Sequence, residues 1–210
     1  MKTIIVMPAH NEEKTVGKTV KACKKYGIVI VINDASTDRT SEVAKKSGAI
    51  VFTHKVNRGL GTALRTGFSE ALKMNAEIII TIDADGQHLP EEIPLFLKKI
   101  EEGYDFVLGS RDLSSYPWVK KFGNFFLNSA TNTIAGTKLK DTESGYRAFK
   151  RAALKKLLLK AQRYEIAAEI VKEVGRNKLK TANVPIHVPI YVKGVGVKDG
   201  IKNFLYILKK

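Results

Sequence analysis

The chain has 210 residues, of which 44% are hydrophobic and 27% are charged, and 36 Lys and Arg against 21 Asp and Glu give a formal charge of +15. This length and composition predict one folded domain and exclude a disordered or low-complexity chain. Cys23 is the single cysteine, which excludes an intrachain disulfide and a cysteine-based zinc site. The positive charge predicts an anionic partner without distinguishing nucleic acid, lipid headgroups and phosphorylated substrates.

Neither a signal peptide nor a membrane-spanning helix is predicted. Only a four-residue apolar run, residues 4–7, precedes Pro8, which is too short for the core of a signal peptide. The longest charge-free stretch, residues 122–137, has 16 residues, fewer than the roughly 20 that cross a bilayer. We therefore expect a cytoplasmic protein.

In the first half of the chain, apolar runs of strand length alternate with segments of helical period. The predicted strands are residues 3–7, 28–32, 49–53, 77–82 and 105–109, and the predicted helices are residues 12–26, 38–47, 60–74 and 90–101. Strands rich in Ile and Val indicate burial on both faces, so the alternation predicts an α/β fold with a mostly parallel, Rossmann-like sheet and flanking helices. The second half breaks this rhythm, with helices near residues 151–175 and a strand near 181–189.

Polar side chains follow the predicted strands, where open α/β sheets bind their ligands. The clearest group follows the strand at residues 77–82, where Asp83, Asp85 and Gln87 alternate with Ala84 and Gly86. Two carboxylates and an amide oxygen are hard ligands suited to Mg²⁺ or Mn²⁺, which keep positions open for phosphate oxygens. An acidic turn would have the same residues, so this segment alone does not decide the function.

Six segments taken together resemble a family 2 glycosyltransferase of the GT-A fold, in particular the dolichyl-phosphate mannosyltransferases and their glucosyl relatives. They are residues 6–13, 31–40, 57–61, 83–88, 109–111 and 141–149. The resemblance covers nearly the whole chain. It implies inverting transfer of a sugar from a nucleoside diphosphate, with GDP-mannose as the leading donor, to a polyprenyl or dolichyl phosphate.

The resemblance also implies roles for individual residues within a single domain, with residues 1–110 binding the nucleotide sugar and residues 111–210 the acceptor. The implied nucleotide-sugar contacts are Pro8, His10, Glu12, Asp34, Arg58, Gly59, Asp83, Ala84 and Asp85. The implied metal ligands are Asp83, Asp85 and Gln87, and the implied catalytic residues are Asp83, Asp85, Arg111 and Arg147. The implied acceptor contacts are Arg111, Ser129, Ser144, Arg147, Lys193 and Lys198.

Several of these residues also fit a purely structural role. Glu12 suits a helix N-terminus, where the dipole favours a carboxylate. The planar forks of Arg111 and Arg147 suit phosphate and suit structural ion pairs equally. The chain also departs from the family pattern, because Asn33 replaces a usual aspartate and residues 193–198 carry lysines where the family often has an arginine.

Attachment to a membrane rests on residues 118–136, which alternate aromatic and small polar residues. The pattern predicts either an interfacial helix or an ordinary amphipathic helix packed on the sheet. In the first case the protein binds the cytoplasmic face of the membrane by peripheral contact, through surface charge or a membrane-protein partner.

Three rival functions remain. One is a family 2 transferase that uses UDP-glucose or UDP-N-acetylglucosamine and a hydroxyl acceptor. Another is a nucleotidyltransferase, which would require a glycine-rich, arginine-containing loop where residues 8–12 lie. The third is a basic nucleic-acid-binding module, but the lysines are spread over every predicted helix without an aromatic-basic stripe, so we expect no nucleic-acid partner.

Overall fold

The computed structural model describes residues 1–111, 118–188 and 206, with the backbone alone for residues 118–124. The strands are β1 (Thr3–Ala9), β2 (Ile28–Asn33), β3 (Ile50–Thr53), β4 (Ile78–Thr81), β5 (Phe106–Arg111), β6 (Arg147–Lys150) and β7 (Thr181–Ile186). The helices are α1 (Val16–Cys23), α2 (Thr40–Lys46), α3 (Leu60–Lys73), the 3₁₀ helix η1 (Pro90–Glu92), α4 (Ile93–Glu101), α5 (Trp118–Ala135), α6 (Arg151–Leu154) and α7 (Ile166–Arg176).

All seven strands belong to one sheet in the order β3-β2-β1-β4-β6-β5-β7. Neighbouring strands pair in parallel except at β6, which is antiparallel to both β4 and β5. The predicted α/β fold with a mostly parallel sheet is therefore confirmed, whereas strand β6 was not predicted. Because β6 runs in the opposite direction, its first residue, Arg147, pairs with Thr81 at the end of β4.

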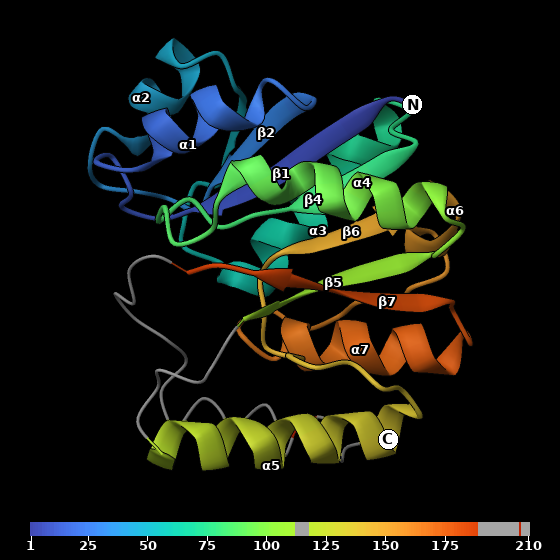
Figure 1. Cartoon of the computed structure of the whole chain (residues 1–210). Helices are drawn as coiled ribbons and strands as arrows, with labels where there is room; N and C mark the ends of the chain where they lie inside the picture. Colours follow the sequence, from blue (N-terminus) through green and yellow to red (C-terminus); the bar gives the residue numbers. More distant parts are fainter. Residues whose placement is uncertain (112–117, 189–205, 207–210) are drawn as a thin grey trace.

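Helices cover both faces of the sheet (Figure 1). Alternate residues of β1 point to opposite sides, since Ile4 belongs to the core formed with α3 and α7, while Ile5 belongs to the core formed with α1 and α4. This alternation is the two-residue period of a strand buried on both faces. Helix α5 packs against α7 and lies farther from the sheet than α7 does (Figure 1).

The predicted first helix begins too early. Residues 13–15 form a turn, in which the backbone N–H groups of Thr15 and Val16 donate to the Glu12 carbonyl at 3.2 and 2.9 Å, and α1 begins at Val16. Glu12 therefore precedes the helix and remains on the loop that follows β1. Over the described ranges, no helix is both long and apolar enough to span a bilayer.

Candidate active site

A cavity of about 510 Å³ lies where the parallel strands of the sheet end. Eleven of the residues expected to act in the site line it: Pro8, His10, Glu12, Asp34, Gly59, Asp83, Ala84, Asp85, Gln87, Arg111 and Arg147. They come from six different segments of the chain. The fold thus brings the predicted nucleotide, metal and catalytic residues to one place, as expected for an open α/β sheet.

The predicted acceptor residues are less concentrated. Ser144 is fully buried, and its Oγ accepts a hydrogen bond from the Tyr146 backbone at 3.3 Å. Ser129 is exposed on α5 and does not line the cavity. Lys193 and Lys198 lie outside the described residues. The acceptor roles of these four residues remain predictions.

Three carboxylates form the acidic end of the cavity: Glu12 after β1, and Asp83 and Asp85 after β4. Gln87 orients Asp85, because its backbone N–H donates to Asp85 Oδ1 at 2.9 Å and its side-chain amide donates to Asp85 Oδ2. The amide nitrogen of Gln87 thus supports a carboxylate in this arrangement. Its expected role as a third metal ligand, through the amide oxygen, remains a prediction.

Asp83 lies between a histidine and two arginines. His88, which is 6% exposed, places Nε2 at 3.4 Å from Asp83 Oδ2. Burial raises the pKa of Asp83. The hydrogen bond and charge of His88 and the charges of Arg147 and Arg111 lower the pKa by more than burial raises it, so that the net pKa lies below its usual value. Gly145 leaves the room for this carboxylate, since a Cβ there would lie within 2.4 Å of Asp83 Oδ2.

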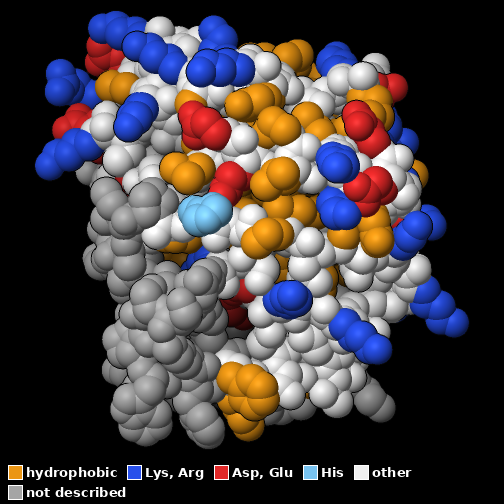
Figure 2. All heavy atoms as spheres, in the orientation of Figure 1, with side chains coloured by type: hydrophobic (Ala, Val, Ile, Leu, Met, Phe, Trp, Pro, Cys, Tyr) orange, Lys and Arg blue, Asp and Glu red, His pale blue; other side chains and the backbone are white. Residues whose placement is uncertain are grey.

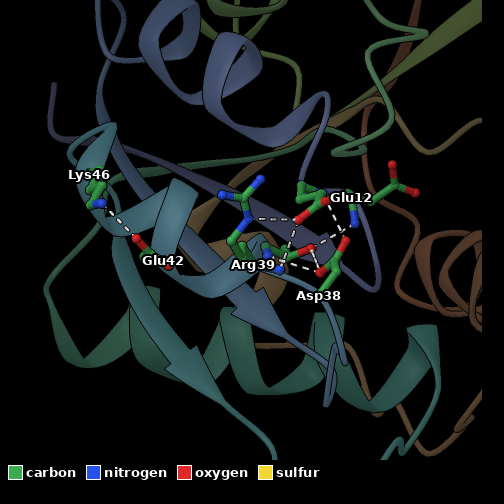
Figure 3. Close-up of polar contacts among 7 residues, drawn as sticks. Glu12, Asp38, Arg39, Glu42 and Lys46 are labelled. Carbon is green, nitrogen blue, oxygen red and sulfur yellow. Dashed lines mark hydrogen bonds and ion pairs between the residues drawn. The ribbon is translucent and has the colours of Figure 1, made fainter.

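Glu12 has the opposite environment. Burial and the charge of Asp85 raise its pKa, although Thr15 Oγ1 donates a hydrogen bond to its carboxylate at 3.1 Å. Figure 3 shows the network that holds this loop against the start of α2. The Glu12 backbone donates to Thr40 Oγ1 at 2.7 Å, and the Thr40 hydroxyl in turn donates to Asp38. The hydrogen bond of its backbone therefore fixes the position of Glu12. The Glu12 carboxylate lies close to other carboxylates.

Two arginines form the basic end of the cavity. Arg147 is 2% exposed, and within the described part of the chain its Nε has no hydrogen-bond partner. Burial lowers the pKa of its guanidinium, an effect that the charge of Asp83 opposes. Arg111 is bound in bidentate fashion to Asp141, with Nε and Nη2 at 2.6 and 2.8 Å from the carboxylate oxygens. Arg111 thus forms the structural ion pair that the sequence allowed, and it also lines the cavity.

Asp34 organises a third wall, at the start of α3. Its carboxylate accepts the backbone N–H groups of Arg58 and Gly59 at 2.9 and 2.7 Å and lies 2.7 Å from His54 Nδ1. Gly59 has a φ of +86°, a conformation that side chains with a Cβ rarely adopt. The side chain of Arg58 is exposed and lies outside the cavity lining, so its expected nucleotide contact remains a prediction. The sequence analysis missed His54, although it directly follows a predicted strand.

The loop before α7 supplies residues that the sequence analysis also missed. Glu169 is 7% exposed, and its carboxylate accepts backbone N–H groups from Lys160 and Ala161, each at 2.9 Å. These bonds fix the loop so that Arg163 and Tyr164 reach the edge of the cavity. No linear motif marks these residues, because their position depends on a carboxylate of the following helix.

The donor chemistry of the acidic end fits Mg²⁺ or Mn²⁺, because Asp83 and Asp85 offer hard oxygen ligands beside a third carboxylate. No cluster of three or more His, Cys, Asp or Glu side chains that could hold an ion occurs in the described ranges. We therefore expect an ion here to take its other ligands from substrate phosphate oxygens and water, as Mg²⁺ does in nucleotide-dependent enzymes.

Two curated proteins match this chain over most of its length. The N-acetylglucosaminyltransferase of Methanococcus voltae that acts from UDP-N-acetylglucosamine on dolichyl phosphate is 33% identical over 97% of this chain and 94% of that protein. The polyprenol monophosphomannose synthase of Mycolicibacterium smegmatis is 28% identical over 95% of this chain and 82% of that protein.

The fold agrees as well. A solved structure of glucosyl-3-phosphoglycerate synthase from Mycobacterium tuberculosis, in complex with Mn²⁺, UDP and glucosyl-3-phosphoglycerate, superposes with a TM-score of 0.79 over 98% of this chain and 79% of that chain, at 22% identity. At that identity the match shows the shared GT-A fold. The model of the family described as Glycosyl transferase family 2 matches residues 4–158, and the chain belongs to that family.

Proposed function

We propose that this chain is a metal-dependent glycosyltransferase that moves a sugar from a nucleoside diphosphate to a polyprenyl phosphate. The observation that carries the proposal is Arg147, a guanidinium that is 2% exposed and has its Nε unpartnered among the described residues. An unpaired buried donor is costly, and a phosphate oxygen would satisfy it. Asp83 and Asp85 line the same cavity, so that one space offers ligands to a cation and a donor to an anion.

The two ends of the cavity suit the two charges of a metal-bound diphosphate. Asp83 and Asp85 would hold Mg²⁺ or Mn²⁺, which neutralises the diphosphate and makes it a better leaving group. Arg147 would donate to phosphate oxygens as negative charge develops on the departing diphosphate. Arg111, held by Asp141, adds positive charge from the end of β5. These residues act mainly by electrostatic stabilisation.

A phosphate acceptor simplifies the chemistry. The second pKa of a phosphate monoester is about 6, so that its oxygen is already anionic near pH 7 and attacks the anomeric carbon without a general base. We propose a single displacement, with attack opposite the leaving diphosphate and inversion at the anomeric carbon. The names of both curated relatives, which specify dolichyl phosphate and a polyprenol monophosphomannose product, support a lipid phosphate as acceptor.

Two donors have support. The name of the relative at 33% identity specifies UDP-N-acetylglucosamine, and that of the relative at 28% identity specifies mannose. GDP-mannose was the leading donor in the sequence analysis, and it stays a prediction. We place UDP-N-acetylglucosamine first because the more similar relative supports it.

The lipid acceptor leads us to propose peripheral contact with a membrane. On α5, the side chains of Phe125 and Phe126 are 72% and 55% exposed, as in a helix that rests on a lipid surface. On the face shown in Figure 2, Lys and Arg side chains are spread over several separate places rather than gathered in one continuous patch, so this face gives no support to the nucleic-acid alternative. Phe125→Ser with Phe126→Ser should reduce sedimentation with anionic vesicles, whereas unchanged sedimentation would contradict membrane contact through α5.

A transfer assay tests the reaction itself. Purified protein is incubated with Mn²⁺ and radiolabelled GDP-mannose, UDP-N-acetylglucosamine or UDP-glucose, together with dolichyl phosphate or with dolichol as the hydroxyl control. We expect label in the lipid phase with the phosphate acceptor only, and none when EDTA is present. Transfer to dolichol alone would favour the hydroxyl-acceptor alternative, and the absence of transfer from every donor would contradict the proposal.

A further inference from the structure

The imidazole of His54 connects the nucleotide wall of the cavity to helix α3. The side chain of His54 is 9% exposed and that of Asp34 is 6% exposed, so that their contact is largely shielded from water. His54 Nδ1 lies 2.7 Å from Asp34 Oδ1, and His54 Nε2 lies 3.0 Å from Thr66 Oγ1. The order Asp34–His54–Thr66 therefore forms a continuous chain of polar contacts under the cavity.

The direction of the hydrogen bond between His54 and Asp34 follows from counting the donors around Asp34. Each of its two carboxylate oxygens already accepts a backbone N–H group. The carboxylate takes His54 Nδ1–H as a further donor. On the other side of the ring, Nε2 lies against the Thr66 hydroxyl, which also contacts the Thr62 carbonyl at 3.0 Å and is thereby held on α3.

Among the residues that the structure describes, the same count leaves Asp34 with one open position. A carboxylate has about four acceptor positions. His54 and the Arg58 backbone occupy both positions of Oδ1, and the Gly59 backbone occupies one of Oδ2. Asp34 lines the cavity, so that the remaining position of Oδ2 is available to a ligand that donates a hydrogen bond.

We infer that His54 is a positioning residue that holds Asp34 through its Nδ1–H, with the free acceptor position of Asp34 directed toward an N–H or O–H group of the donor's nucleoside. This inference rests on the proposed function and deepens it. Fixed geometry matters because Asp34 also shapes the loop at Arg58 and Gly59.

The first test observes the protons directly. Long-range ¹H–¹⁵N correlation spectra of the wild-type protein at pH 7 should show His54 with a proton on Nδ1. A His54 spectrum with an unprotonated Nδ1 would overturn the inference. This measurement needs no ligand, so that it is independent of whether the protein is a glycosyltransferase.

The second test separates the nucleoside from the diphosphate. Calorimetry with Mn²⁺ measures UDP, GDP and inorganic pyrophosphate binding to wild type, His54→Phe and His54→Asn. His54→Phe, which lacks the Nδ1–H donor, should weaken binding of the preferred nucleotide by about tenfold or more while pyrophosphate affinity stays within about twofold. His54→Asn, whose amide still donates to Asp34, should recover part of the loss.

Two controls complete the design. His187→Phe makes the same substitution at a histidine outside the cavity lining and should leave nucleotide affinity unchanged. If His54→Phe does not fold, the spectrum of the wild type and the His54→Asn variant decide. Equal loss of nucleotide and pyrophosphate affinity in either variant would overturn the inference, as would wild-type nucleotide affinity in His54→Phe. A wild-type protein that binds pyrophosphate but no nucleotide would instead contradict the proposed function.

Discussion

The acidic and basic ends of the cavity are built in different ways. The acidic residues Glu12, Asp83 and Asp85 follow β1 and β4, two neighbouring parallel strands whose ends meet at one edge of the sheet. Arg147, by contrast, is the first residue of β6, and it reaches the same edge only because β6 runs antiparallel to β4. The acidic end of the cavity therefore follows from the alternation of strands and helices. The basic end depends on the reversal of chain direction at β6.

The two ends also differ in how their charges are balanced. Asp83 contacts His88, and the neighbouring arginines help to lower its pKa. Glu12 remains beside other carboxylates, and Arg147 is buried with its Nε–H donating to none of the described residues. The protein alone leaves both ends incompletely neutralised. This difference suggests that ligand charges complete the site, and the predictions below test each end in turn.

Removing the acidic end should have the largest effect. Asp83→Asn and Asp85→Asn each remove a carboxylate charge with little change of shape, and we expect kcat to fall by about a thousandfold, as for other groups that stabilise transition-state charge. Steady-state kinetics with titrated Mn²⁺ measures the loss, and circular dichroism confirms the fold. Retained kcat in Asp85→Asn would show that the acidic end does not hold the catalytic ion.

Removing the basic end should have a somewhat smaller effect. Arg147→Met keeps the length of the side chain but removes its charge and donors, and we expect kcat to fall by about a hundredfold. Because a buried, incompletely paired charge is costly, the melting temperature should stay equal or rise. Arg147→Lys serves as the matched control, since it keeps the charge without the planar fork and should recover part of the rate. Loss of folding without loss of rate per folded molecule would identify Arg147 as purely structural.

Gly145→Ala tests how closely the two ends approach. The added methyl group would lie within 2.4 Å of Asp83 Oδ2, so that the carboxylate has to move. We expect kcat to fall by about tenfold, since a displaced catalytic group loses its aligned geometry. Gly136→Ala is the control, because no atom lies within 4 Å of the added methyl group, although its positive φ adds some backbone strain. Equal rates in the two variants would show that Asp83 adapts freely.

The smallest expected effect concerns stability and pH. The raised pKa of Glu12 means that the folded state binds its proton more tightly than the unfolded state does, so that ionisation of Glu12 destabilises the fold. This cost is absent below the unfolded pKa near 4.5 and is complete above the raised folded pKa. Glu12→Gln, which can still accept from Thr15, should therefore raise the melting temperature at pH 7 and leave it unchanged near pH 4.

Glu42→Gln gives the matched control with the opposite sign. Glu42 is exposed and accepts a hydrogen bond from Lys46 at 2.6 Å, which lowers its pKa (Figure 3). Its ionised form thus stabilises the fold above the unfolded pKa, and the variant should melt slightly lower at neutral pH only. Melting curves between pH 4 and pH 8 that shift in the same direction for both variants would contradict the electrostatic account of Glu12.

Local pattern was sufficient to predict the first part of the fold. The alternation of apolar strands and helices predicted β1 to β5 and α2 to α4 within a few residues, because every strand of this group except β3 is largely buried and each helix buries one face. The motif after β4 also predicted that Asp83 and Asp85 would lie together, since both follow a single strand. The helix predicted for residues 118–136 corresponds to α5.

Other features depended on contacts between distant segments. Strand β6 was missed because four residues, Arg147–Lys150, give too short a pattern to identify a strand or its direction. His54 and Glu169 acquire their roles from partners 20 and 8 or 9 residues away, which no local motif specifies. The sequence by itself thus determined most of the elements and the position of the acidic residues after their strands, because periodicity and strand ends are local properties. Only the tertiary structure decided the basic end and the buried polar contacts, because burial and pairing arise when separate segments pack together.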